Sequence, residues 1–156
     1  MAERSNDDFD AVLAAFAKYD SFWVVSHIHP DPDAIGSQLA LAHYLKRQGK
    51  HVEVISRDTV PRITRYLPGA EWCRQQPETL GLDALVVMDV SSLERIGKDL
   101  AAKLEPAHAT INIDHHATGV PFADVAAVRT DAAATCEILY DFFQYADEPI
   151  DRDIKR

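Results

Sequence analysis

Four short apolar runs, together with segments of helical periodicity, constrain the fold of this chain more than any other feature. The runs cover residues 22–26, 51–55, 83–89 and 109–114. Apolar residues recur at helical spacing over residues 7–19, 34–48 and 130–145. Strands that alternate with helices predict right-handed βαβ connections. With a further edge strand at 123–128, we expect a Rossmann-like, doubly wound α/β sheet of about five mainly parallel strands, with helices on both faces.

The composition is typical of one soluble globular domain. The 156 residues are 47% hydrophobic and 26% charged, which is enough apolar material for a real core. No apolar run has the length of a membrane span, and the N-terminus does not resemble a signal peptide. Cys73 and Cys136 form no C-x-x-C pattern, so free thiols and a cytoplasmic location are expected.

The net charge of −9 argues against a simple basic surface for nucleic acid. It does not exclude a substrate that carries phosphate, because bound divalent cations would reverse the local sign of the charge.

Polar clusters follow three of the apolar runs, at the carboxyl end of each predicted strand. Their members are His27, Asp31 and Asp33 after the first run, Asp89 after the third, and Asp114, His115 and His116 after the fourth. Open α/β sheets place their active sites at this end of the strands. Three strand ends with Asp and His therefore predict one shared metal centre.

Each cluster also has a simpler interpretation when it is taken alone. Asp33 could only cap the following helix, and Asp89 could bond to Ser91 or Ser92. Two adjacent histidines in a loop often have a surface or packing role. The convergence of all three clusters favours the metal centre.

Histidine and carboxylate ligands without thiolate suit Mn²⁺ or Mg²⁺, with Fe, Co or Zn as alternatives. Two ions about 3.5–4 Å apart are suited to hydrolysis of a phosphate ester. Asp89 is placed to bridge such a pair.

These motifs resemble the DHH phosphoesterase family, and in particular its nanoRNase branch of bifunctional oligoribonucleases and 3′-phosphoadenosine 5′-phosphate (PAP) phosphatases. Residues 27–37 resemble the H-x-x-x-D-x-D-A-x-G-S element of that branch. Asp89 with residues 91–97, the Asp-His-His motif at 114–116 and the A-T-x-E-I-L-Y-like stretch at 133–140 follow in order. The resemblance covers nearly the whole chain.

The resemblance implies a role for each matching residue. His27 and Asp31 would hold one ion, Asp33 and His115 the other, and Asp89 would bridge them. His116 would contact or polarise the scissile phosphate, and Asp114 would orient the cluster. Further candidates for phosphate contact are Ser37, at the start of a helix, and Arg95, which could equally be a solvated surface residue.

Two departures from the family pattern affect the expected activity. Ala117, Thr118 and Gly119 follow the Asp-His-His motif where members often have an Asn. Members also continue to a G-I-x-T-D-T-G strand, which supplies a further metal ligand, and to a C-terminal DHH-associated domain that grips the substrate. We therefore expect residues 1–156 to be the N-terminal catalytic domain of a longer enzyme, which alone binds metal weakly and turns over poorly.

The function implied is hydrolysis of short 5′-phosphorylated oligoribonucleotides, linear dinucleotides or PAP by a hydroxide that two Mn²⁺ ions activate, with Mg²⁺ or Co²⁺ as alternatives. Two other functions remain open: a manganese-dependent pyrophosphatase or exopolyphosphatase, and a non-catalytic nucleotide-binding module. A dinucleotide-cofactor domain is disfavoured, because no G-x-G-x-x-G follows the first strand. The expected partners are the nucleotide substrate and the C-terminal domain; a homodimer is also considered, and no membrane contact is expected.

Overall fold

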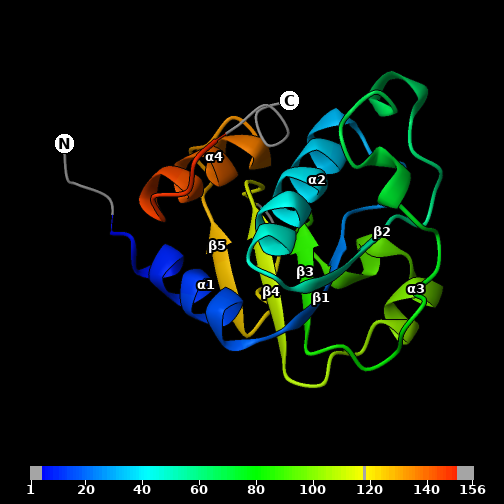
Figure 1. The fold of residues 1–156 in the computed structure, drawn as a ribbon, viewed down its shortest axis with the longest axis horizontal. Helices are drawn as coiled ribbons and strands as arrows, with labels where there is room; N and C mark the ends of the chain where they lie inside the picture. The colour runs from blue at the N-terminus through cyan, green and yellow to red at the C-terminus, as the bar shows by residue number, and fades with distance from the viewer. Residues whose placement is uncertain (1–4, 118, 151–156) are drawn as a thin grey trace.

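The computed structural model describes residues 5–117 and 119–150. Its centre is one parallel sheet of five strands in the order β2-β1-β3-β4-β5 (Figure 1). The strands are β1 (Ser21–Val25), β2 (His51–Ile55), β3 (Ala84–Met88), β4 (Ala109–Asp114) and β5 (Val125–Val128). The predicted doubly wound α/β fold is confirmed, and the short edge strand lies at one end of the sheet as expected.

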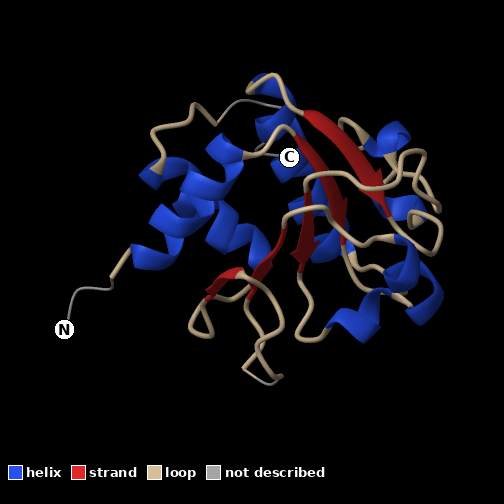
Figure 2. Cartoon of the chain, turned by 90° about the horizontal axis from the view of Figure 1, so that it is seen from below, coloured by secondary structure: helices blue, strands red, loops and turns tan. Residues whose placement is uncertain are grey.

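Helices pack on both faces of the sheet (Figure 2). One face carries α1 (Asp7–Lys18), α2 (Pro32–Arg47) and α4 (Thr135–Tyr145). The other carries α3 (Lys98–Lys103) and the 3₁₀ turn η3 (Leu93–Ile96). Two further 3₁₀ turns, η1 (Arg62–Thr64) and η2 (Ala70–Trp72), lie in the irregular stretch after β2. None of the helices within the described ranges is long and apolar enough to cross a membrane.

Two helix boundaries differ from the predictions for local reasons. Helix α2 begins at Pro32, because Asp31 is its N-cap and accepts a 2.8 Å hydrogen bond from the Ala34 amide. The alternative that Asp33 caps this helix is therefore wrong. Helix α4 begins five residues later than expected, since Ala134 is extended and Glu137 reaches back to the Ala133 amide.

Aromatic side chains hold the three helices of the first face together. The Phe142 ring of α4 lies 5.5 Å from that of Phe9 and 5.8 Å from that of Phe16, both in α1, and 5.9 Å from that of Tyr44 in α2. Edge-to-face pairs of this kind add to the free energy of apolar burial. The position of α4, which matters for the site below, thus depends on this cluster.

The strand order reverses between the neighbouring strands β1 and β3. Their connections leave toward opposite faces at this point, and open α/β sheets bind ligands in the crevice between the loops at such carboxyl ends. The loops after β1, β3 and β4 all meet there, and they carry the clusters that the sequence singled out.

Candidate metal centre

A buried glutamine fixes the end of β1 immediately before the first site residue. Gln38 of α2 donates hydrogen bonds to the Val24 carbonyl at 3.0 Å and to the Ile55 carbonyl at 2.9 Å. Its own side-chain oxygen accepts a 2.7 Å bond from the Ser26 hydroxyl. Because Gln38 is fully buried and its three bonds tie β1 to β2, the backbone that enters the loop at His27 has a fixed direction.

His27 directs one ring nitrogen into the crevice. Nδ1 lies 2.7 Å from the Ile28 carbonyl, to which it donates in the neutral tautomer, so that Nε2 is left as the ligand atom. Nε2 lies 3.3 Å from Oδ2 of Asp89 and 3.8 Å from Oδ1 of Asp31. The hydrogen bond to Asp89 raises the pKa of His27 despite the opposing effect of burial. A cation that binds Nε2 must therefore compete with a proton.

Asp89 lies at the centre of the crevice, and only 3% of it is exposed. Its backbone adopts the left-handed conformation, with φ of 60°, which Asp tolerates better than most residues. Oδ2 faces His27, whereas Oδ1 lies 3.2 Å from Nε2 of His115. The two oxygens of one buried carboxylate thus face histidines from two different strand ends.

The start of α4 holds the carboxylates of the site. The Thr135 and Cys136 amides donate to Oδ2 and Oδ1 of Asp33, at 3.0 and 2.9 Å. Partial burial alone would raise the pKa of Asp33, but these amide bonds outweigh it, so the pKa is lowered and the carboxylate stays charged. The Thr135 hydroxyl also donates a 3.0 Å bond to Oδ1 of Asp89.

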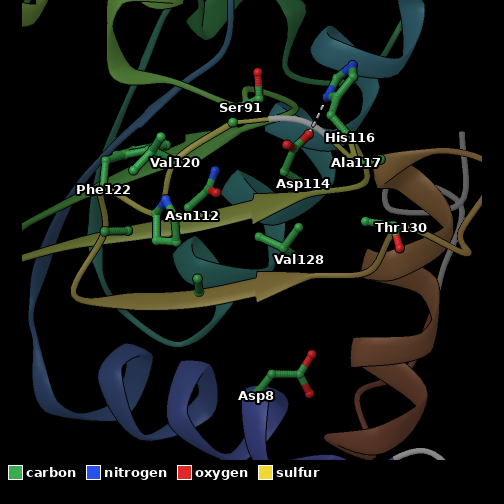
Figure 3. Close-up of a pocket in the computed structure, with 14 residues that line it drawn as sticks. Asp8, Ser91, Asn112, Asp114, His116, Ala117, Val120, Phe122, Val128 and Thr130 are labelled. Carbon is green, nitrogen blue, oxygen red and sulfur yellow. Dashed lines mark hydrogen bonds and ion pairs between the residues drawn. The ribbon is translucent and has the colours of Figure 1, made fainter.

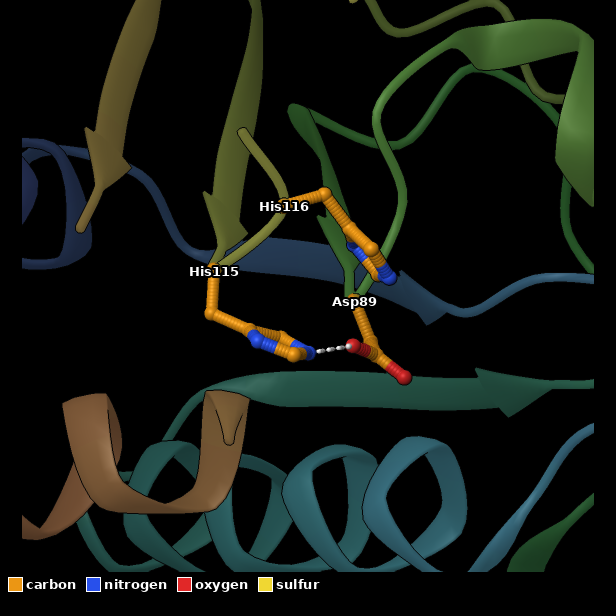
Figure 4. A group of neighbouring side chains, drawn as sticks. All are labelled: Asp89, His115 and His116. Carbon is orange, nitrogen blue, oxygen red and sulfur yellow. Dashed lines mark ion pairs between the residues drawn. The ribbon is translucent and has the colours of Figure 1, made fainter. Parts of the chain in front are cut away.

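The two histidines of the Asp-His-His motif both point toward Asp89 (Figure 4). His115 also lies 3.7 Å from Oδ2 of Asp33 through its Nε2. His116 donates from Nδ1 to Oδ1 of the buried Asp114 at 2.5 Å, a pair that fixes its ring and leaves Nε2 available. The His116 side chain is 44% exposed and that of His115 is 24%, so His116 is the more accessible of the two.

The donor atoms fit a pair of divalent cations. They form two groups that share Asp89: one with His27 and Asp31, the other with His115 and His116, and the ligand atoms within each group lie within 4.8 Å of one another. Neighbouring ligands of an octahedral cation with 2.0–2.1 Å bonds lie about 3 Å apart, close to the 3.2 and 3.3 Å that separate the histidine nitrogens from Asp89. By donor type, a set of imidazoles and carboxylates can hold Mn²⁺, Mg²⁺, Fe, Co or Zn.

The structure does not bring every predicted residue to the crevice. Ser37 is fully buried, and its hydroxyl donates to the Ala34 carbonyl, so it presents no surface to a phosphate. The prediction that Ser37 contacts substrate is therefore not supported. Arg95 is exposed, and its backbone carbonyl accepts a 2.8 Å bond from the Ile28 amide beside His27.

Two positioning residues had no predicted role, namely Thr135 and Gln38. Thr135 belongs to a stretch that matches the family pattern, but sequence alone gives no sign that its hydroxyl reaches Asp89, 46 residues away. For Gln38 the sequence does offer a signal of a structural role, because it is a polar residue on the apolar, buried face of α2.

Loss of the Thr135 hydroxyl should weaken metal binding. Thr135→Val removes the bond to Asp89 while keeping the shape of the side chain, and we expect a loss of about 10–100-fold in Mn²⁺ affinity by titration calorimetry. Thr135→Ser keeps the hydroxyl and should restore the affinity. If Thr135→Val were less stable yet bound Mn²⁺ as tightly as the unmodified chain, the hydroxyl would have only a structural role.

A parallel sheet with histidines and carboxylates at its switch point is typical of metal-dependent hydrolases of the α/β class. The chain belongs to the DHH family: the model of the family's N-terminal domain matches residues 21–156. The resemblance inferred from the motifs is thus confirmed.

Curated relatives and a solved structure agree with this assignment. The bifunctional oligoribonuclease and PAP phosphatase NrnA of Thermus thermophilus is 34% identical over 120 residues, which are 76% of this chain and 35% of that protein. NrnA of Bacillus subtilis is 25% identical over 132 residues, 85% of this chain and 41% of that protein. An exopolyphosphatase-related protein of Bacteroides fragilis has a TM-score of 0.82 at 25% identity, covering 90% of this chain and 44% of that one. The chain spans about two fifths of the length of these curated relatives.

Proposed function

We propose that this domain hydrolyses phosphoesters of short 5′-phosphorylated oligoribonucleotides, linear dinucleotides or PAP, with two Mn²⁺ ions as cofactors. The observation that carries the proposal is Asp89, a buried carboxylate whose two oxygens face His27 on one side and His115 on the other. The names of the Thermus and Bacillus relatives favour short oligoribonucleotides and PAP as substrates.

Each side chain of the crevice has a distinct part in the proposed reaction. His27 and Asp31 would hold one cation, Asp33 and His115 the other, and Asp89 would ligate both. When bound, the cations would activate the attacking water and neutralise charge on the phosphate. The fixed Asp33 and Asp89 carboxylates keep the ligand positions from having to reorganise during the reaction.

His116 would act on the phosphate itself. Because Asp114 holds Nδ1, the ring keeps its orientation, and in the imidazolium form its Nε2–H would donate to a non-bridging oxygen. Its greater exposure relative to His115 favours this role. A ligand atom of His116 also lies within 4.8 Å of those of Asp89 and His115, so metal titration of a His116→Ala variant distinguishes a ligand from a phosphate contact.

A second function, hydrolysis of pyrophosphate or polyphosphate, is favoured by one finding. The structurally similar protein of Bacteroides fragilis is described as exopolyphosphatase-related. The same metal centre would serve both reactions, so the substrates must be compared directly.

The test combines metal binding with two product assays. We expect specific Mn²⁺ uptake by the chain in calorimetry, and Mn²⁺-dependent release of AMP from pApA or PAP at high enzyme concentration. Phosphate release from pyrophosphate under the same conditions should be slower. The same assays with Mg²⁺ or Co²⁺ in place of Mn²⁺ identify the metal that gives the fastest turnover.

Three outcomes would contradict parts of the proposal. Faster cleavage of pyrophosphate than of pApA and PAP would replace it with the second function. Specific Mn²⁺ uptake without cleavage of any of these substrates would favour the alternative that the chain is a non-catalytic nucleotide-binding module. Absence of specific Mn²⁺ uptake would contradict the proposed metal centre itself.

A further inference from the structure

A cavity of about 370 Å³ opens beside the proposed metal centre, along β4 and β5, and Asp8 of α1 is among its lining residues (Figure 3). The outward-facing residues of β4 and β5 form its floor, and the loop that follows the Asp-His-His motif forms its wall. Asp114 and His116 of the Asp-His-His motif line it as well, so it borders the proposed metal centre. Its volume is within the range of small-molecule sites.

The walls of this cavity are mainly apolar. Val120, Pro121 and Phe122 lie on the loop side, and Ala126 and Val128 lie on β5. Val120 is 79% exposed and Val128 is 46% exposed. Gly119 brings the loop close to Ser91, since a Cβ at this position would lie 2.4 Å from the Ser91 carbonyl oxygen. An inorganic phosphate chain would gain nothing from such walls, whereas a flat ring would.

Asn112 presents a hydrogen-bond acceptor to the cavity. The side-chain nitrogen of Asn112 donates to the Val87 carbonyl at 3.0 Å and to the Val90 carbonyl at 3.1 Å, which fixes the amide orientation. Its Oδ1 accepts no hydrogen bond within residues 5–117 and 119–150. Asn112 lines the cavity, and this oxygen is not one of the fully buried, unpartnered side-chain atoms of those residues, so it is accessible from the cavity. An amide oxygen that is accessible from a cavity can accept a hydrogen bond, so a ligand with an N–H group would be favoured here.

We propose that this cavity binds a nucleobase of the substrate, with the exocyclic amino group of the base donating to Oδ1 of Asn112. The base would lie between Phe122 and Val128 while its phosphate reaches His116 at the mouth. Proteins commonly bind unstacked bases in this manner, with apolar or aromatic contact on the ring and hydrogen bonds at its edge. This inference rests on the proposed function, and it names the part of the substrate that separates a nucleotide from pyrophosphate.

The test compares ligands that differ at a single group. Binding of AMP, N6,N6-dimethyl-AMP and ribose 5-phosphate to the chain is followed by ¹H–¹⁵N NMR. AMP should shift the side-chain amide of Asn112 and the backbone amides of Ser91 and Ala126. The dimethylated base lacks the donor and should bind about five- to tenfold more weakly, and ribose 5-phosphate should not shift these signals.

A blocking variant gives an independent measurement. Ala126→Trp fills the cavity from an exposed position on β5 and should weaken AMP binding at least about tenfold. Leu80→Trp adds the same ring at a site that is 71% exposed and outside the cavity, and should bind AMP normally. Both variants should take up Mn²⁺ like the unmodified chain.

The results separate this inference from the proposed function. Equal binding of AMP and ribose 5-phosphate, or normal AMP binding by Ala126→Trp, overturns the nucleobase site. The proposed function would then still stand if the chain takes up Mn²⁺ and hydrolyses bis(4-nitrophenyl) phosphate, which has no base. Conversely, AMP binding at Asn112 without any Mn²⁺ uptake supports the nucleobase site and contradicts the proposed function.

Discussion

Asp89→Asn should lower Mn²⁺ affinity by more than about 100-fold and remove measurable phosphoester hydrolysis. Loss of an outer partner of a metal ligand costs about 10–100-fold, and Asp89 would ligate both cations directly. Asn has nearly the same volume as Asp and tolerates the left-handed backbone found at this position, so the fold should persist. Calorimetric Mn²⁺ titration and AMP release from pApA are the measurements.

Asp83→Asn is the matched control for this substitution. Asp83 precedes the same strand, β3, but at its opposite end, where its carboxylate accepts hydrogen bonds from the Asp20 and Ser21 amides. That variant should bind Mn²⁺ normally. Retention of full Mn²⁺ affinity by Asp89→Asn would show that the two donor groups do not depend on a shared carboxylate.

Phe142→Ala should lower the free energy of unfolding by about 3–5 kcal/mol, the range observed for a buried Phe that is truncated to Ala. Phe142 is 1% exposed and joins α4 to α1 and α2 through Phe9, Phe16 and Tyr44. Urea denaturation of the metal-free chain, followed by circular dichroism, gives the value. A loss of this size is a large part of the stability of a typical small domain.

Tyr140→Ala provides the comparison on the same helix. Tyr140 is 54% exposed, so its removal should change the free energy of unfolding by no more than about 0.5 kcal/mol. If both variants lost similar stability, the cost would come from helix α4 itself rather than from packing of the aromatic cluster.

The parallel sheet was predictable because its strands are short apolar runs and its helices have regular apolar spacing. The positions of His27, Asp89 and His115 followed from the same pattern, since the ends of parallel strands meet at one edge. Edge strand β5 was also foreseen, although it begins at Val125 rather than at residue 123.

The remaining features depend on contacts between distant segments, which periodicity does not encode. The start of α4 at Thr135 reflects the extended backbone of Ala134, and the burial of Ser37 reflects the packing of α2 on the sheet. The pairing of Asp33 with the Thr135 and Cys136 amides joins residues about a hundred positions apart. The cavity floored by Asn112 likewise arises only when the loop after His116 folds back over β4 and β5.

Hydrogen bonds from the start of α4 fix Asp33 and Asp89, and they couple the affinity for a cation to folding of the whole domain. Because the donors come from the loops after β1, β3 and β4, and α4 fixes two of them, an unfolded chain has no arrangement comparable to this one. Free cation at 100 times its dissociation constant would then raise the free energy of unfolding by about 2.7 kcal/mol. The melting temperature of the domain should therefore rise with cation concentration, and thermal denaturation can measure affinity without any substrate.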